Sequence, residues 1–201
     1  LQPYIYKKNQ LEDGGKFNFG ALYEYDLGSK EFKVLYSFNK NLLSSPKGPI
    51  YFYNYKIYGT AEHLDRFRHF RIFAYDLTND SLEIINKGIL EDLDIEAHFF
   101  TYKKDTAISI AYNGGNNNQG FIYKLDLKSN TAIKVADFSD FSEGKSPFGK
   151  ILTDGKGIFY GFCQDNSTSF SDGILYSYNT HTKQFSIEHE FIEPWGRTPT
   201  G

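Results

Sequence analysis

The sequence predicts an all-β protein of the β-propeller class, with about four repeats of roughly 50 residues that each fold into a four-stranded antiparallel blade. The first observation is a short aromatic strand that recurs at this spacing, at residues 22–27, 72–77, 122–127 and 175–180. The second is an aromatic content of 18%, which favours pleated, half-buried surfaces. The third is that no window sustains the 3.6-residue period of a helix.

The first strand of a repeat opens with Pro-x-Gly, at Pro46-Lys47-Gly48, Pro147-Phe148-Gly149 and Pro199-Thr200-Gly201. Proline is tolerated at a strand start, and glycine suits a strand crowded near the axis of a ring. The third repeat has Asp94-Ile95-Glu96-Ala97 in this place. The second strand centres on 5–6, 57–59, 108–111 and 159–161.

The third strand is the recurrent one, and in most repeats it closes on Asp followed by polar residues, which predicts an Asx turn. The fourth strand alternates and ends on phenylalanine, at Phe38, Phe138 and Phe191. A blade packs both of its faces against neighbouring blades, so both faces need apolar residues. We therefore expect these three phenylalanines to be buried between blades.

The repeats divide the chain into segments of about 1–45, 46–93, 94–145 and 146–198, which form a single β-propeller region over residues 1–201. The terminal repeats look incomplete, since Leu1 to Tyr6 resembles the middle of a repeat and Pro199 to Gly201 the opening of one. We expect four blades of a larger ring. The alternative is a closed four-bladed ring in which the two termini share one sheet.

Composition limits the partners. The net charge of −3 offers no field that would recruit nucleic acid. No apolar run is long enough to span a bilayer in this segment, and no signal peptide or initiating Met is present. Cys163 is the only cysteine, so no internal disulfide can form. We expect Cys163 to be a small buried residue of the core.

Several spaced motifs in register give the chain a family resemblance. Residues 120–161 begin with Gly120-Phe121-Ile122-Tyr123-Lys124-Leu125-Asp126 and continue through Phe138, Pro147-Phe148-Gly149 and Asp154-Gly155 to Tyr160-Gly161. Residues 20–60 follow the same order, ending on Tyr58-Gly59-Thr60. This pattern resembles the GloVer-type tandem repeat over nearly the whole chain. The match departs at Lys7 and Ala111, which stand where the pattern has glycine after tyrosine.

The resemblance implies a propeller-like fold, no established enzymatic activity, and a bacterial protein that is exported or tethered at the cell surface. Because no set of metal-ligating residues recurs from repeat to repeat, we expect no cofactor and no tightly bound metal.

Candidate binding residues lie in the loops. His63 and Arg66 belong to a charged loop that could hold an anion or a metal, although no ligand pattern recurs. Asn116 and Asn117 lie in a turn whose amides could bind sugar hydroxyls. Trp195 and Arg197 are residue types that anchor protein interfaces.

Two classes of function remain. The first is a non-catalytic scaffold that presents its loops to a protein or a glycan. The second is a propeller glycoside hydrolase or polysaccharide lyase with acidic residues at the central channel. Glu91-Asp92 and the Asp94–Glu96 pair would be its carboxylates, provided that their separation in space is suitable.

Overall fold

The computed structural model describes residues 15–63, 70–85, 100–103, 105–138, 144–165 and 173–192. Within these ranges every regular element is a β-strand. The chain separates into two compact units, residues 1–85 and 86–201. Each unit is described by itself.

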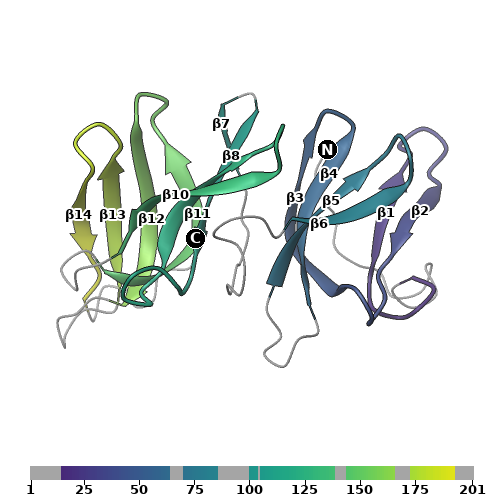
Figure 1. Ribbon diagram of the computed structural model, residues 1–201, viewed down its shortest axis with the longest axis horizontal. Helices are drawn as coiled ribbons and strands as arrows, with labels where there is room; N and C mark the ends of the chain where they lie inside the picture. Colours follow the sequence, from purple (N-terminus) through teal and green to yellow (C-terminus); the bar gives the residue numbers. More distant parts are fainter. Residues whose placement is uncertain are drawn as a thin grey trace. The chain divides into compact units, whose positions relative to one another are not determined.

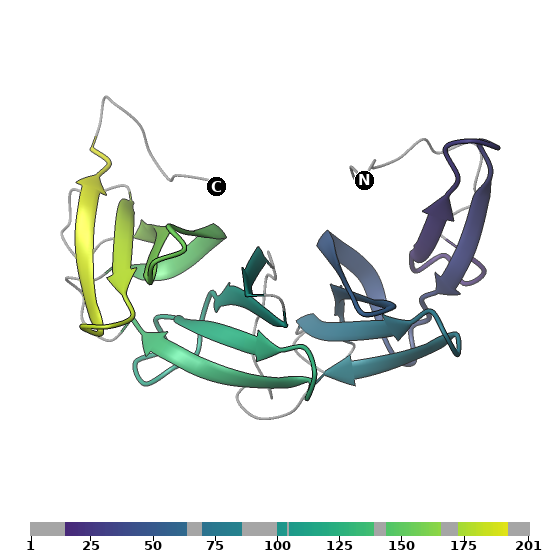
Figure 2. The same cartoon turned by 90° about the horizontal axis from the view of Figure 1, so that it is seen from above.

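The first unit contains two sheets (Figures 1 and 2). Blade one contributes β1 (Ala21–Tyr25) and β2 (Phe32–Ser37), an antiparallel pair. The predicted second strand of this blade, at residues 5–6, lies outside the described residues. Blade two is a four-stranded antiparallel sheet of β3 (Ser44–Tyr53), β4 (Lys56–Glu62), β5 (Phe70–Asp76) and β6 (Ser81–Ile85).

The second unit holds two four-stranded antiparallel sheets. Blade three consists of β7 (Phe100–Lys103), β8 (Thr106–Ala111), β9 (Phe121–Asp126) and β10 (Thr131–Asp137). Blade four consists of β11 (Lys145–Thr153), β12 (Ile158–Asp165), β13 (Ile174–Asn179) and β14 (Gln184–Glu190). Figure 1 shows blade four as strands side by side in chain order, from green β11 to yellow β14. The predicted strand content and pairing are confirmed, while Asp94 to Ala97 lies outside the described residues.

In each unit, described residues of its two sheets form a hydrophobic core between them. We call the face of a blade that meets the next blade its front face, and the opposite one its back face. In the second unit, Ile108, Ile110, Ile122 and Phe138 form the front face of blade three. They belong to one buried cluster with the back face of blade four, namely Ile151, Phe159, Cys163, Ile174, Tyr176 and Tyr178. The buried position of Cys163 agrees with its expected role as a small core residue.

The core of the first unit uses the same positions. Leu22 and Phe38 of blade one cluster with Ile57, Phe73 and Tyr75 of blade two. The Tyr75 hydroxyl also donates to the Leu35 carbonyl over 2.9 Å. Tyr178 reaches the Val135 carbonyl in the same way, over 3.4 Å. The repeat therefore specifies the packing between blades as well as the strands.

An aromatic ring on the neighbouring strand explains why glycine follows tyrosine in the second strands of blades two and four. Gly59 pairs with Phe73, and Gly161 pairs with Tyr176. A Cβ at Gly161 would lie 2.4 Å from the Tyr176 hydroxyl oxygen, so the ring leaves room for glycine only. In blade three the residue paired with the equivalent ring, Tyr123, is Ser109. The sequence assignment of Ala111 to this position was therefore wrong, by two residues along one strand.

The Pro-x-Gly motif has a different role from the expected one. Gly48 and Gly149 have φ values of +78° and +77°. The pairing register of β3 with β4 shifts between Lys47 and Tyr51, and that of β11 with β12 between Phe148 and Leu152. The glycine thus supplies the left-handed backbone of an irregularity within the strand. Crowding near a ring axis is not needed to explain it.

The proline of the motif contacts the preceding blade. A Cβ at Gly20 would lie 2.4 Å from Pro46 Cδ, and one at Gly120 would lie 2.5 Å from Pro147 Cδ. The residue before each proline donates its N–H across the same junction, Ser45 to the Phe19 carbonyl over 2.8 Å and Ser146 to the Gln119 carbonyl over 3.0 Å. We call this arrangement the interblade latch. Blade two has Phe70 where the other third strands are preceded by glycine.

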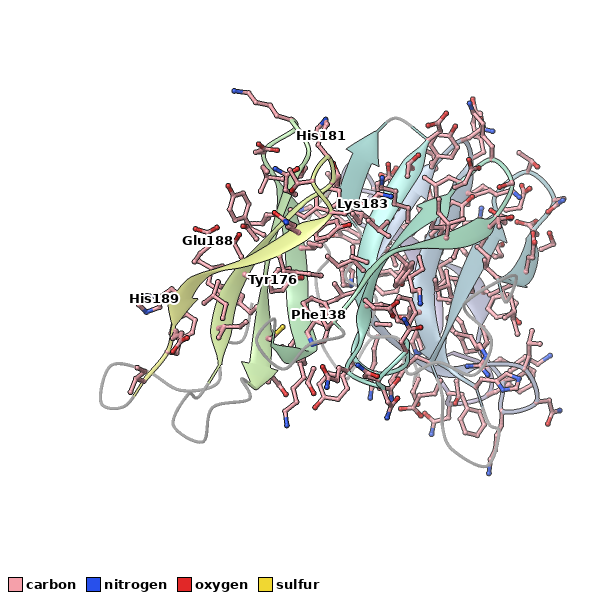
Figure 3. All side chains as sticks on the ribbon, turned by 60° about the vertical axis from the view of Figure 1, so that its left-hand side comes forward. Phe138, Tyr176, His181, Lys183, Glu188 and His189 are labelled. Carbon is pink, nitrogen blue, oxygen red and sulfur yellow. The ribbon has the colours of Figure 1, made fainter. Side chains whose placement is uncertain are left out.

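The burial expected of the phenylalanines that end the fourth strands is confirmed for two of the three. Phe38 and Phe138 are each only 1% exposed. Phe191 is partly exposed, so its predicted burial is wrong for the described structure. Figure 3 shows Phe138 close to Tyr176 in the interior, whereas Glu188 and His189 lie on the outer strand β14. Phe191 follows β14 and lies on the front face of blade four, against which no described residue of another blade packs.

Each turn after a third strand is held by a side-chain oxygen of the Asp or Asn that begins it. Asp126 Oδ1 accepts the N–H groups of Lys128 and Ser129 over 2.9 and 2.8 Å. Asp26 and Asp76 act in the same way, and Asn179 accepts from His181 and Thr182 with its amide oxygen. The predicted Asx turns are therefore confirmed, and an amide can replace the carboxylate.

These turns predict an acid-dependent part of the stability. Hydrogen bonds from Ser29, Thr78 and Ser129 lower the pKa of Asp26, Asp76 and Asp126 respectively below the usual 3.8. A carboxylate with a lowered folded-state pKa stabilises the fold above its unfolded pKa, and this contribution is lost as pH falls through the folded value.

We expect the triple variant Asp26→Asn, Asp76→Asn, Asp126→Asn to remain folded, as Asn179 indicates. Its unfolding free energy should fall less steeply than that of the parent between about pH 5 and pH 2. Urea titrations of both proteins across this range measure the difference. Parallel pH profiles would show that the three turns contribute nothing to acid sensitivity.

Candidate binding turns

The turns between the second and third strands of blades one and three have the same backbone. In each, a left-handed Asn donates its N–H to the glycine three residues before it, Asn18 to Gly15 over 3.1 Å and Asn118 to Gly115 over 3.5 Å. The turns end on Gly20 and Gly120, whose carbonyls accept the N–H groups of Phe38 and Phe138. Gly15 and Gly115 are thus loop glycines with positive φ, at +85° and +77°.

Each turn is tied to the end of its own fourth strand. Lys16 donates its N–H to Ser37 Oγ over 3.2 Å, and Asn116 donates its N–H to Asp137 Oδ1 over 3.3 Å. Asp137 also forms an ion pair with Lys134. A Cβ at Gly115 would lie 2.3 Å from Asp137 Oδ1, so this close tie requires glycine.

The tips of the two turns carry different side chains on this common frame. In blade one the exposed tip is Lys16 and Phe17, with Phe17 46% exposed and the ammonium of Lys16 5.4 Å from its ring centroid. In blade three the exposed tip is Asn116 and Asn117. Asn116 Oδ1 lies 3.5 Å from Lys134 Nζ. One tip can make apolar and cationic contacts, while the other can exchange hydrogen bonds with a ligand.

Of the residues predicted from sequence, Asn116 and Asn117 are therefore exposed on an ordered turn. His63 is half-buried at the end of β4. Arg66, Trp195 and Arg197 lie outside the described residues, as do the carboxylates of residues 91–96. Lys16 and Phe17 were missed, although the sequence carries a signal for them, since both Gly-Gly pairs are followed by an Asn and a Gly at the same spacing.

The described ranges contain no group of three or more His, Cys, Asp or Glu side chains that could hold a metal ion. In the same part of the chain, no helix is long and apolar enough to cross a membrane.

Antiparallel four-stranded sheets that repeat with one packing scheme define the chain as a β-propeller repeat protein. It belongs to the Gloeobacter/Verrucomicrobia repeat family, whose model matches residues 10–201. This confirms the resemblance drawn from the spaced motifs.

Solved structures agree on the fold. The chain is 18% identical to TolB from Acinetobacter baumannii, with a TM-score of 0.55 over 85% of this chain and 38% of that one. A solved structure from Agrobacterium tumefaciens that is described as TolB is 11% identical, with a TM-score of 0.50 over 94% of this chain and 62% of that one. An oligogalacturonate lyase in complex with manganese reaches a TM-score of only 0.40 at 13% identity, over 89% and 62% of the two chains.

TolB is a β-propeller protein, and the chain spans less than two thirds of the length of each of these three structures. No curated protein matches it. At these identities the likeness concerns the fold alone.

Proposed function

We propose that the chain is a non-catalytic recognition module that binds a protein or a glycan through the turns between its second and third strands. The observation that carries the proposal is a constant turn frame with different exposed tips, Lys16-Phe17 in blade one and Asn116-Asn117 in blade three. Variable side chains on a rigid frame are typical of recognition loops. The exposed Phe17 ring favours a protein ligand, and the amides of Asn116 and Asn117 favour a glycan.

The ordered frame favours binding for an energetic reason. Because each turn is held by backbone hydrogen bonds and tied to its fourth strand, a ligand would not have to order the loop. Less conformational entropy is then lost on association. Trp195, Arg197, His63 and Arg66 stay candidate ligand contacts of their own blades, because in a propeller the loops after the second and fourth strands of a blade share one end of it.

The test uses two probes, a glycan array and a peptide display library, each screened against the purified 201-residue chain. Phe17→Ala should weaken a selected peptide at least about tenfold, and the double variant Asn116→Ala, Asn117→Ala should do the same for a selected glycan. The melting temperature should stay nearly unchanged. The matched control is Thr182→Ala, an exposed residue in the turn after the third strand of blade four.

Binding that survives both tip variants would contradict the proposal, as would the absence of any binder. Turnover of a polysaccharide that is lost on replacing Glu91 or Asp92 would support the hydrolase or lyase alternative instead.

The proposal also places the protein outside the cell, exported or surface-tethered, and this part is supported by the family resemblance. Fractionation of cells that express the native protein tests it. Recovery from the medium or the cell envelope is expected, whereas recovery only from the cytoplasm would overturn it.

A further inference from the structure

The turn between β8 and β9 of blade three uses hydrogen-bond acceptors of its own to hold its shape. The Gly114 carbonyl accepts the N–H of Gly120 over 3.1 Å. The Gly115 carbonyl accepts the N–H of Asn118 over 3.5 Å. Asn118 Oδ1 in turn accepts the N–H of Gly114 over 2.9 Å. An amide has one acceptor oxygen and two N–H donors, so this last bond directs the donor end of Asn118 away from the turn backbone.

The side chain of Asn116 is oriented in the same way by a different partner. Its Oδ1 lies 3.5 Å from Lys134 Nζ, and an ammonium group can only donate. Both Asn116 and Asn118 are exposed, and their amide nitrogens donate to no described residue. The tip of the turn therefore presents N–H groups of both side chains to solvent.

The charged groups that hold this tip carry no net charge. One oxygen of Asp137 pairs with Lys134, and the other accepts the N–H of Asn116 over 3.3 Å. The turn sequence itself, residues 113–120, contains no Asp or Glu. Residues 15–20 of the blade-one turn also contain none, and the exposed side chain of Lys16 adds a positive charge there. Neither turn has a carboxylate of its own that would repel an anion.

A tip that offers donors discriminates between the polar groups of a ligand. A sugar hydroxyl both donates and accepts, so a site for a neutral sugar gains from acceptor side chains as well as donors. An ionised carboxylate or sulfate only accepts, and hydrogen bonds to a charged acceptor are roughly twice as strong as those between neutral groups. The tip of blade three matches the charged acceptor better than the hydroxyl.

We infer that the turn of blade three selects an acidic glycan, whose carboxylate or sulfate group accepts hydrogen bonds from the exposed amides of Asn116 and Asn118. This inference rests on the proposed function, because it specifies the glycan that the turn binds. A glycan fits the tip better than an acidic peptide does, since residues 116–118 are all Asn and offer no apolar side chain for the buried centre of a protein interface.

The first test compares acidic and neutral forms of the same glycan. The purified 201-residue chain is screened on an array of uronate, sialate, sulfated and neutral glycans. Each acidic binder is then measured again after its carboxylates have been reduced to alcohols or its sulfates removed. Affinity should fall at least about tenfold when the anion is removed, and it should weaken as the ionic strength is raised. The carboxylate and sulfate arms show which group supplies the anion.

The second test changes the donors and keeps the shape of the turn. Asn116→Asp and Asn118→Asp each retain an oxygen for Lys134 or for the N–H of Gly114, but replace the outward N–H groups with a carboxylate oxygen. Each should weaken an acidic glycan at least about tenfold and leave the melting temperature nearly unchanged. Asn179→Asp is the matched control, because it adds the same charge in the turn after the third strand of blade four, where the other blades carry Asp. It should leave binding unchanged.

The outcomes separate this inference from the proposed function. A neutral glycan that requires Asn116 and Asn117 but tolerates both Asp variants would overturn the inference and leave the proposed function standing. A ligand of this turn that comes only from the peptide library would do the same. An acidic glycan that binds both Asp variants as tightly as the parent would also show the inference to be wrong. If neither screen yields a binder, the inference and the proposed function fail together.

Discussion

Phe138→Ala is expected to lower the unfolding free energy by about 3–5 kcal/mol, the cost of removing a large buried ring. The ring is 1% exposed and lies edge-on to Tyr176, with centroids 5.0 Å apart. It also packs against Phe185 at 4.7 Å. The cavity would therefore open between two sheets, where neither can close it without moving a whole strand.

Urea unfolding measures the change, and the chain supplies its own controls. Phe38→Ala, at the equivalent buried position of the first unit, should cost a similar amount. Phe191→Ala should cost clearly less in the 201-residue chain, because Phe191 is partly exposed. Equal losses at Phe138 and Phe191 would show that exposure does not set the cost, and a loss below about 1 kcal/mol at Phe138 would contradict its place in the core.

The sequence predicted the strands well because their signals are local. Alternation over a few residues and an Asp or Asn at the end of each third strand suffice to locate them. The Asx turns at Asp26, Asp76 and Asp126 form between residues two and three apart, so no tertiary information was needed. Burial of Phe38 and Phe138 followed from the rule that blades pack on both faces.

Contacts that depend on the pairing register of the strands were harder to predict from the sequence. The pairing of Ser109 with Tyr123 is set by the length of the turn between β8 and β9, and a motif that lists only spacings within one strand misses it. Phe191 was misjudged for another reason. Its burial depends on what packs against it, whereas its own strand pattern matches that of Phe138.

The interblade latch could have been read from the sequence. Gly20, Gly120 and Gly173 are each followed about 26 residues later by a proline of Pro-x-Gly. Blade two has Phe70 in place of this glycine, and the third repeat lacks the proline. The two halves of the latch are thus present or absent together. The spacing of glycine and asparagine in the sequence marks the turn that holds Lys16 and Phe17, but the exposure of the two side chains follows from the fold of the turn.

Gly20→Ala should be among the most destabilising single changes in the chain. Gly20 has a φ of +100°, which L-residues rarely adopt, and a new Cβ would lie 2.4 Å from Pro46 Cδ and 2.9 Å from Pro46 Cγ. The matched control is Gly155→Ala, where φ is +73° and no atom lies within 4 Å of the added Cβ. Backbone strain alone should cost about 1–2 kcal/mol at Gly155, and the overlap with proline should raise the loss at Gly20 well above that.

A double-mutant cycle separates the two causes at Gly20. Pro46→Ala removes the ring atoms that the new Cβ would meet, so in that background Gly20→Ala should retain only its backbone strain. The unfolding free energies should then show a coupling of about 0.5–3 kcal/mol between the two positions, with the double variant more stable than additivity predicts. Additive losses would mean that the proline ring does not press on Gly20, and the latch would then consist of the Ser45 hydrogen bond alone.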